Sequence, residues 1–177
     1  VRRVVGVDER FRMDAAALKV AIVADLQAGL EPWLIVASAG TTNTGSVDPL
    51  AEIADVAEYH GLWCHVDGAY GALFALCPEG RAVVGGMDRS HSVVLDPHKK
   101  LFLPYGTGTV LVKDRAKLYA AFNAHADYLQ DVLDAVDELS SADLSPELTR
   151  HFRGLRLWLP LKLLGVAPFR AALSEKI

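Results

Sequence analysis

The chain has 177 residues, a hydrophobic content of 51% and a formal net charge of -4 at pH 7. A soluble chain of this length and composition can bury a sizeable core, so we expect a globular protein. The 22 acidic residues outnumber the 18 basic ones, and no long basic run occurs, which argues against a nucleic-acid partner.

The first predicted elements are a helix and a strand. Asp14 belongs to a residue type that caps helix N-termini, and the apolar pattern after it predicts a helix that ends near Gly29. The continuous apolar run 33–38 predicts a strand of a sheet covered on both faces. A loop at 39–45 follows this strand.

The next helix has recognisable ends. Asp48 is its predicted N-cap, Pro49 is its predicted first residue, and Gly61 follows its predicted end. The apolar run 62–66 then predicts a second buried strand, with Asp67 at its carboxyl end.

The remaining strands place a second polar motif beside the first. Residues 93–95 predict a third strand, and Asp96 to Lys99 follow its carboxyl end. A fourth strand is predicted at 108–112 and a helix at 115–122. The alternation of strands and helices predicts an α/β fold with a mainly parallel sheet flanked by helices. Ligands bind such sheets beyond the carboxyl ends of the strands, where both motifs lie.

The C-terminal third is less regular. Residues 128–146 are acidic and lack clear periodicity, which predicts a surface loop. Residues 148–164 show a helical pattern, and we expect a kink or a boundary at Pro160.

The pattern around Cys64 and Cys77 favours a reducing compartment, because it is neither a disulfide framework nor a metal-ligand spacing. No segment is apolar enough to span a bilayer, and the N-terminus lacks a secretory signal. We therefore expect a cytoplasmic protein without a membrane partner. The chain begins at Val1, inside an apparent strand, so we expect it to be part of a longer protein.

Lys99 is the first candidate catalytic residue. Its amine can form a Schiff base with an aldehyde when nearby charge or desolvation favours the neutral form, and His98 and Lys100 adjoin it. A lysine after a buried strand is also an ordinary solvated strand end.

Asp67 is the second candidate. A carboxylate at the end of an apolar strand needs a cation or several donors, and the protonated ring nitrogen of pyridoxal phosphate is such a cation. Asp67 would equally cap the turn that follows it.

Three weaker signals accompany this pair. Gly68 and Ala69 leave room for a flat ring, or simply form a tight turn. His98 suits a phosphate oxygen, although a lone histidine is more often an ordinary polar side chain. Thr41 and Thr42 present hydroxyls after a strand end, where threonine is common in any case.

A metal site is not predicted. His65 and Asp67 lie two apart on a strand and face the same side, as two ligands would. His60, Cys64 and Cys77 do not supply a third or fourth ligand at convincing spacing.

Four blocks of sequence together resemble the group II pyridoxal phosphate-dependent amino-acid decarboxylases, which include aromatic-amino-acid, glutamate, histidine and diaminobutyrate decarboxylases. The blocks are AGTTNTGSVDPL at 39–50, GLWCHVDGAYG at 61–71, DPHK at 96–99 and RHFRGLRLW at 150–158. Their order and spacing extend the resemblance over nearly the whole chain.

The resemblance implies a fragment of the type I, aspartate aminotransferase-like large domain. It implies that Lys99 forms the Schiff base with pyridoxal 5'-phosphate and that Asp67 holds the pyridinium nitrogen. It also places Ala69 against the ring, Thr42 near the cofactor, and His98 with Asp96 near the phosphate. The implied reaction is decarboxylation of an α-amino acid by a homodimer.

The sequence departs from the family pattern at several positions. Lys100 stands where the family usually has Trp or Thr, and Gly68 replaces the first alanine of the His-Val-Asp-Ala-Ala run. The loop that carries a proton-donating tyrosine in aromatic-amino-acid decarboxylases corresponds to about 131–149, which contains no tyrosine or histidine, and Tyr128 lies just before it. Aldehyde formation or another carbon–carbon lyase reaction is therefore an alternative.

The resemblance also implies a division of the chain. Residues 1–147 correspond to the second half of the cofactor-binding large domain, and 148–177 to the helix that leads into a small C-terminal domain. The N-terminal half of the family, which carries most phosphate-binding residues, has no counterpart. A truncated, non-catalytic chain is therefore a further alternative.

Overall fold

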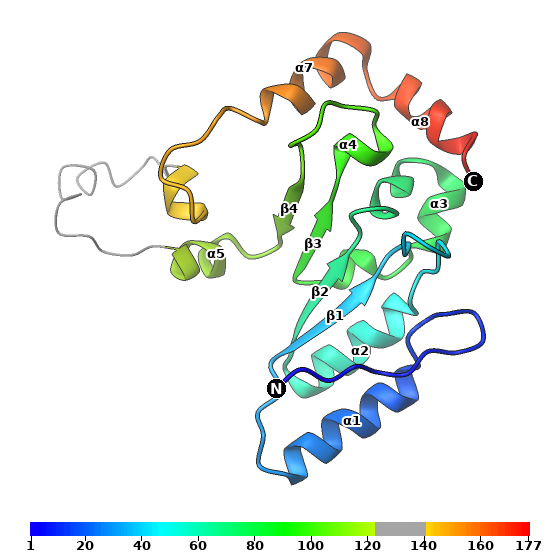
Figure 1. Cartoon of the computed structure of the whole chain (residues 1–177), viewed down its shortest axis with the longest axis vertical. Helices are drawn as coiled ribbons and strands as arrows, with labels where there is room; N and C mark the ends of the chain where they lie inside the picture. The colour runs from blue at the N-terminus through cyan, green and yellow to red at the C-terminus, as the bar shows by residue number, and fades with distance from the viewer. Residues whose placement is uncertain (123–140) are drawn as a thin grey trace, which may run out of the picture.

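The computed structural model describes residues 1–122 and 141–177. Four strands form one sheet in the order β1-β2-β3-β4 (Figure 1), with β1 at Leu34–Ser38, β2 at Trp63–Asp67, β3 at Ser92–Leu95 and β4 at Thr109–Val112. The first three strands are parallel and β4 runs antiparallel to β3. The predicted α/β fold with a mainly parallel sheet is therefore confirmed.

Helices alternate with the strands as the sequence predicts. The α-helices are α1 (Ala15–Gln27), α2 (Leu50–His60), α3 (Pro78–Val83), α4 (Pro97–Lys100), α5 (Arg115–Phe122), α7 (Leu155–Leu164) and α8 (Ala167–Ser174). Short 3-10 helices lie at η1 (Ala72–Leu76), η2 (Met87–Arg89) and η4 (Ser141–Leu144). None of the helices in the described part of the chain has the length and apolarity needed to cross a membrane.

Two predicted helix ends are confirmed by their local chemistry. The Asp14 carboxylate accepts hydrogen bonds from the backbone N–H groups of Ala16 (2.8 Å) and Ala17 (3.1 Å), so it caps α1. Gly61 ends α2 with φ 65°, the left-handed conformation that glycine adopts without steric cost.

The predicted role of Asp48 as the N-cap of α2 is wrong. Its carboxylate instead accepts hydrogen bonds from the backbone N–H groups of Met13 and Ser38, each at 2.7 Å. Asp48 is 9% exposed, and these contacts join the N-terminal segment to the end of β1. The cap position of α2 is held by Pro49, which makes no side-chain hydrogen bond.

The predicted helix at 148–164 is shorter in the structure. It begins at Leu155, directly after Gly154, a residue type that weakens helices. The helix continues through Pro160 to Leu164, so Pro160 is not a helix boundary, and the expected kink at Pro160 stays a prediction. Of the predicted acidic loop, residues 128–140 lie outside the described residues.

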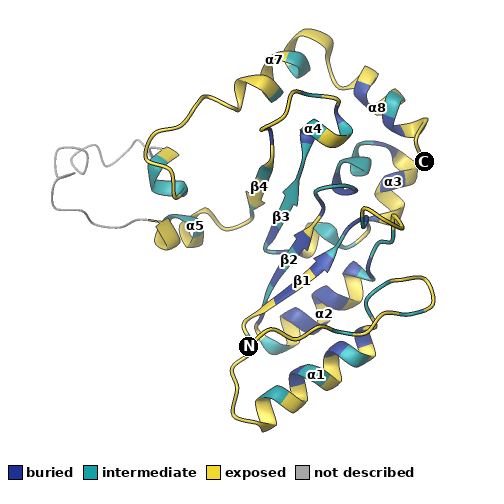
Figure 2. Ribbon diagram, in the orientation of Figure 1, coloured by how far each residue is buried: buried dark blue, intermediate teal, exposed yellow. Residues whose placement is uncertain are grey.

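Along β1 and β2, buried residues alternate with more exposed ones (Figure 2), so these two strands bury one face and leave the other partly open. The covered face carries Ile35, Ala37, Cys64 and Val66, which pack in one core with residues of α1 and α2. The opposite face exposes Leu34 (37%), Val36 (50%) and Val110 (56%). The prediction that β1 is covered on both faces is therefore wrong for this chain, because its described helices cover only one.

The end of the chain packs against η1 and the segment after α4. In α8, Phe169 and Leu173 are buried together with Cys77 and Leu101 in a second core. Leu101 follows α4 directly, so α8 packs close to the segment that carries Lys99. The division of the chain at 147/148 stays a prediction.

Candidate functional site

The two predicted motifs meet at one edge of the sheet. Asp67 is the last residue of β2, and it is paired in parallel register with Val94 of β3. The chain leaves β3 at Leu95 and enters α4 at Pro97, so Lys99 lies just beyond the neighbouring strand end. Parallel pairing thus brings Asp67 and α4 to the same carboxyl edge, where α/β proteins bind ligands.

Within the DPHK motif, Asp96 contacts both Lys99 and His98. The Lys99 Nζ lies 2.7 Å from Asp96 Oδ2, and His98 Nε2 lies 3.8 Å from the same oxygen. The Lys99 side chain is 42% exposed, whereas the Asp96 side chain is 15% exposed. Asp96 thus holds the amine at the edge of the sheet while the amine stays open to solvent.

Gly108 passes close to this cluster. A Cβ on Gly108 would lie 3.1 Å from Asp96 Oδ1, which is closer than most side-chain contacts. The glycine of the PYGTG run therefore allows the chain to pass the Asp96 carboxylate.

His98 has an unused polar atom. Its Nδ1 is buried and, among the described residues, has no hydrogen-bond partner. Buried polar atoms in proteins are normally hydrogen-bonded. A ring nitrogen available at this edge fits the predicted contact with an anionic phosphate, so the residues present are compatible with the cofactor that the sequence implies.

Asp67 is exposed, and its Oδ1 accepts a hydrogen bond from the backbone N–H of Ala69 at 3.2 Å. This is the turn-capping contact of the alternative interpretation. It engages one carboxylate oxygen and is compatible with a cation at the other. Gly68 is required by packing, because an added Cβ would lie 2.4 Å from the Ala72 Cβ.

Thr42 lies in the exposed loop after β1. The loop is held by a hydrogen bond between the hydroxyls of Thr41 and Thr44 (2.6 Å). Across the described residues, no hydrogen bond or ion pair joins Thr42 to Asp67 or to Lys99. The structure thus brings Asp96, His98 and Lys99 into contact, and Asp67 with Ala69, but leaves Thr42 apart.

The histidine of β2 has a structural partner, and both cysteines of the chain are buried. The His65 Nδ1 lies 2.8 Å from Ser92 Oγ. Cys64 and Cys77 are free and buried, and burial raises the pKa of the Cys64 thiol. No group of three or more potential metal ligands occurs in residues 1–122 and 141–177.

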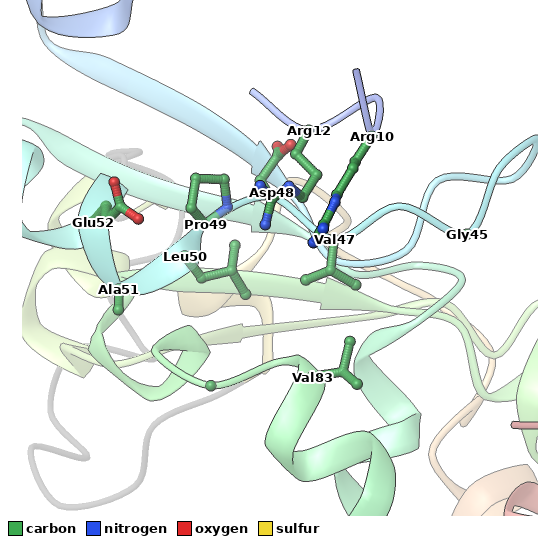
Figure 3. A pocket seen from close by; sticks show the side chains of 11 residues that line it. Arg10, Arg12, Gly45, Val47, Asp48, Pro49, Leu50, Ala51, Glu52 and Val83 are labelled. Atoms are coloured by element: carbon green, nitrogen blue, oxygen red, sulfur yellow. The ribbon is translucent and has the colours of Figure 1, made fainter. Parts of the chain in front are cut away.

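A separate hollow of about 340 Å³ lies at the start of α2. Figure 3 shows Arg10 and Arg12 on one side of it and Leu50 and Val83 on the other. None of the predicted site residues lines it. Arg12 is paired with Asp8 at 2.7 Å, so its guanidinium is already engaged.

Two contacts at the edge were not predicted. The Lys100 Nζ lies 3.5 Å from the centre of the Tyr70 ring. Arg156 of α7 donates a hydrogen bond from Nη1 to the backbone oxygen of Tyr105 at 2.8 Å. Lys100 adjoins Lys99 and Tyr70 follows Asp67 by three residues, but only the fold brings these side chains together.

Comparisons with known proteins identify relatives of the whole chain. Residues 2–177 match the model of the pyridoxal-dependent decarboxylase conserved domain. The chain is 41% identical over 171 residues to an aromatic-L-amino-acid decarboxylase of Bacillus atrophaeus, which covers 96% of the chain and 36% of that protein. It is 36% identical over 168 residues to a phenylacetaldehyde synthase of Petunia hybrida, at 94% and 33% coverage.

Comparison with solved structures also identifies a relative that binds PLP. A crystal structure of Oryza sativa TDC with PLP and tryptamine superposes with a TM-score of 0.85 at 34% sequence identity, covering 92% of the chain and 33% of that protein. The chain thus spans about a third of the length of these relatives.

Proposed function

This chain belongs to the pyridoxal-dependent decarboxylase family, and on that premise we propose that it uses Lys99 and Asp67 to hold pyridoxal phosphate for the decarboxylation of an α-amino acid. The placement of these two residues at neighbouring strand ends carries the proposal. The contacts of Lys99 and His98 with Asp96 support it.

Each residue of the edge has a task in this proposal. Lys99 Nζ, once it has passed a proton to solvent or to a neighbouring base, would hold the cofactor through its aldehyde carbon, and the aldehyde oxygen would leave as water. Asp96 Oδ2 orients that amine. Asp67 would keep a proton on the ring nitrogen, and His98 Nδ1 would bind an oxygen of the phosphate. When bound, the cofactor supplies an electron sink for the α-carbon that loses carbon dioxide.

A cofactor titration tests the proposal directly. We expect pyridoxal phosphate to produce a visible absorbance band with the wild-type chain, because the link to a lysine extends the conjugation of the ring. Lys99→Ala should abolish the band, whereas Lys19→Ala, on the exposed surface of α1, should leave it unchanged. A band of equal intensity in Lys99→Ala would contradict the role of Lys99.

Aldehyde formation is the second candidate reaction; it would need dioxygen as oxidant and water, and it would release ammonia and hydrogen peroxide together with the aldehyde and carbon dioxide. The 36% identity to a phenylacetaldehyde synthase supports it. Tyr128, the nearest candidate for the proton donor that favours amine formation, lies outside the described residues. Incubating the cofactor-loaded protein with a panel of amino acids, and quantifying amine, aldehyde and carbon dioxide, separates the two reactions: amine with carbon dioxide supports decarboxylation alone, and aldehyde supports the alternative.

A non-catalytic chain is the third candidate, and the span of about a third of its relatives supports it. Absence of the visible band in a chain whose circular dichroism shows native helix content would favour this reading. The titration above therefore also decides between an enzyme and a cofactor-free subunit.

We also propose that the active protein is a homodimer. The exposed apolar side chains of α7 support further assembly, since Trp158 is 56%, Leu163 72% and Leu164 62% exposed. Light scattering measures the molar mass in solution. A dimer mass would agree with the proposal, and a monomer mass at micromolar concentration would contradict it.

A further inference from the structure

Two lysines stand side by side in α4, and their amines have different surroundings. The Lys99 Nζ lies 2.7 Å from Asp96 Oδ2. The Lys100 Nζ lies 3.5 Å from the centre of the Tyr70 ring and 4.9 Å from that of Phe74. Successive residues of a helix point about 100° apart, so the two side chains leave α4 in different directions.

The Tyr70 ring lines one hollow together with Lys100 and Gly40. Tyr70 belongs to the loop that follows Asp67, and a Cβ on Gly40 would lie 3.7 Å from the Tyr70 Cδ1. Gly40 belongs to the loop after β1. Lys100 therefore joins α4 to a ring that belongs to the loop after β2 and lies close to the loop after β1.

The backbone of α4 is anchored independently of this contact. Pro97 is fully buried at its first residue, and Leu101 is 3% exposed directly after its last. Loss of the Lys100 contact would therefore release the Lys100 side chain without unfolding the turn. We therefore expect the contact between Lys100 and Tyr70 to affect which lysine amine is free more than it affects the folding of α4.

We propose that Tyr70 and Lys100 select the reactive lysine: the aromatic surface holds the Lys100 amine and leaves Lys99 as the amine of α4 that links to the cofactor. This inference rests on the proposed function. It makes Tyr70 and Lys100 positioning residues. An ammonium over an aromatic ring is stabilised by the negative face of the ring, by an amount that corresponds to roughly a three- to tenfold change in an equilibrium constant at a half-buried site.

Mapping of the linked lysine tests the selection. The chain is incubated with pyridoxal phosphate, the link is reduced with borohydride, and fragment-ion mass spectrometry locates the modified lysine. We expect the label on Lys99 in the wild type. In Tyr70→Leu the ratio of label on Lys100 to label on Lys99 should rise about three- to tenfold, because the cation–π contact is lost.

Conservative variants and a matched control sharpen the test. Tyr70→Phe keeps the ring and should keep the wild-type ratio. Tyr59→Leu removes a tyrosine that is 85% exposed on α2 and should also leave the ratio unchanged. An unchanged ratio in folded Tyr70→Leu, or comparable label on both lysines in the wild type, would overturn the inference and leave the proposed function standing. No label on either lysine would overturn the proposed function and the inference together.

A measurement on the wild type needs neither the cofactor nor a variant that folds. In competitive reductive methylation, Lys100 should react about three- to tenfold more slowly than the exposed Lys19 of α1, because its amine is held on the ring. Equal rates for these two lysines would show that the Lys100 amine is free and would overturn the inference.

Discussion

The core under the sheet and the carboxyl edge of the sheet differ in burial and in hydrogen bonding. In the core, Ile53, Ala37 and Val66 are at most 1% exposed and lie among other apolar side chains. At the edge, Lys99 is half-exposed and His98 has a buried nitrogen without a partner among the described residues. The apolar side chains of the core pack against one another, whereas the edge presents the Lys99 amine and the His98 ring nitrogen, which a ligand could bind. This difference separates residues that stabilise the fold from residues that are available to bind a ligand.

The largest expected effect lies in the core. Ile53→Ala should lower the free energy of unfolding by about 2–5 kcal/mol, because it removes buried methylene groups and leaves a cavity. Urea unfolding measures the change. Val20→Ala, at a site 70% exposed on α1, is the matched control and should change stability by less than about 0.5 kcal/mol. Equal effects of the two variants would show that α2 is not packed as described.

A substitution at the edge should instead lower activity and leave stability unchanged. Asp67→Asn should keep the hydrogen bond from the Ala69 N–H but lose the charge that holds a ring proton. We expect amino-acid turnover to fall about a hundredfold or more, as when one partner of a charge pair is removed. The urea midpoint should not move, because Asp67 is exposed. Full turnover in Asp67→Asn would remove Asp67 from the site.

Asp48 holds the N-terminal segment to the end of β1, and its substitution should show an intermediate effect. Asp48→Asn replaces one accepting oxygen with an NH₂ group, so one of the N–H groups of Met13 and Ser38 loses its acceptor. Such a loss costs about 1–3 kcal/mol in the free energy of unfolding. Asp88→Asn, at an exposed site, is the control for the loss of one charge. Equal unfolding midpoints for the two variants would contradict the structural role of Asp48.

The smallest expected effect depends on pH. Burial raises the pKa of the Cys64 thiol, so the folded chain disfavours the thiolate relative to the unfolded chain. The contribution of this thiol to stability is fully present below its unfolded pKa and is lost as the pH rises through its folded pKa. Urea midpoints measured between pH 8 and pH 10.5 under reducing conditions should therefore fall more steeply in the wild type than in Cys64→Ala. Parallel pH profiles would contradict this.

The local sequence determined much of the fold and of the candidate site. The helix limits at Asp14 and Gly61 were predicted because caps act over two or three residues, within one turn of the chain. The placement of Asp67 and Lys99 after strands was predicted because apolar runs mark buried strands. Their common edge follows once the strands are parallel.

The tertiary structure alone decided the partners of side chains that are distant in sequence. The Asp48 carboxylate binds the N–H of Met13, 35 residues away, in place of the helix that follows it. Lys100 reaches the Tyr70 ring only because β2 and β3 are neighbours. The open face of β1 was not predicted, because a continuous apolar run is compatible with a strand that is covered on one face or on both. Helix caps and strand ends depend on consecutive residues and can be predicted from them. Contacts across the sheet depend on the order of the strands and on which helices cover them.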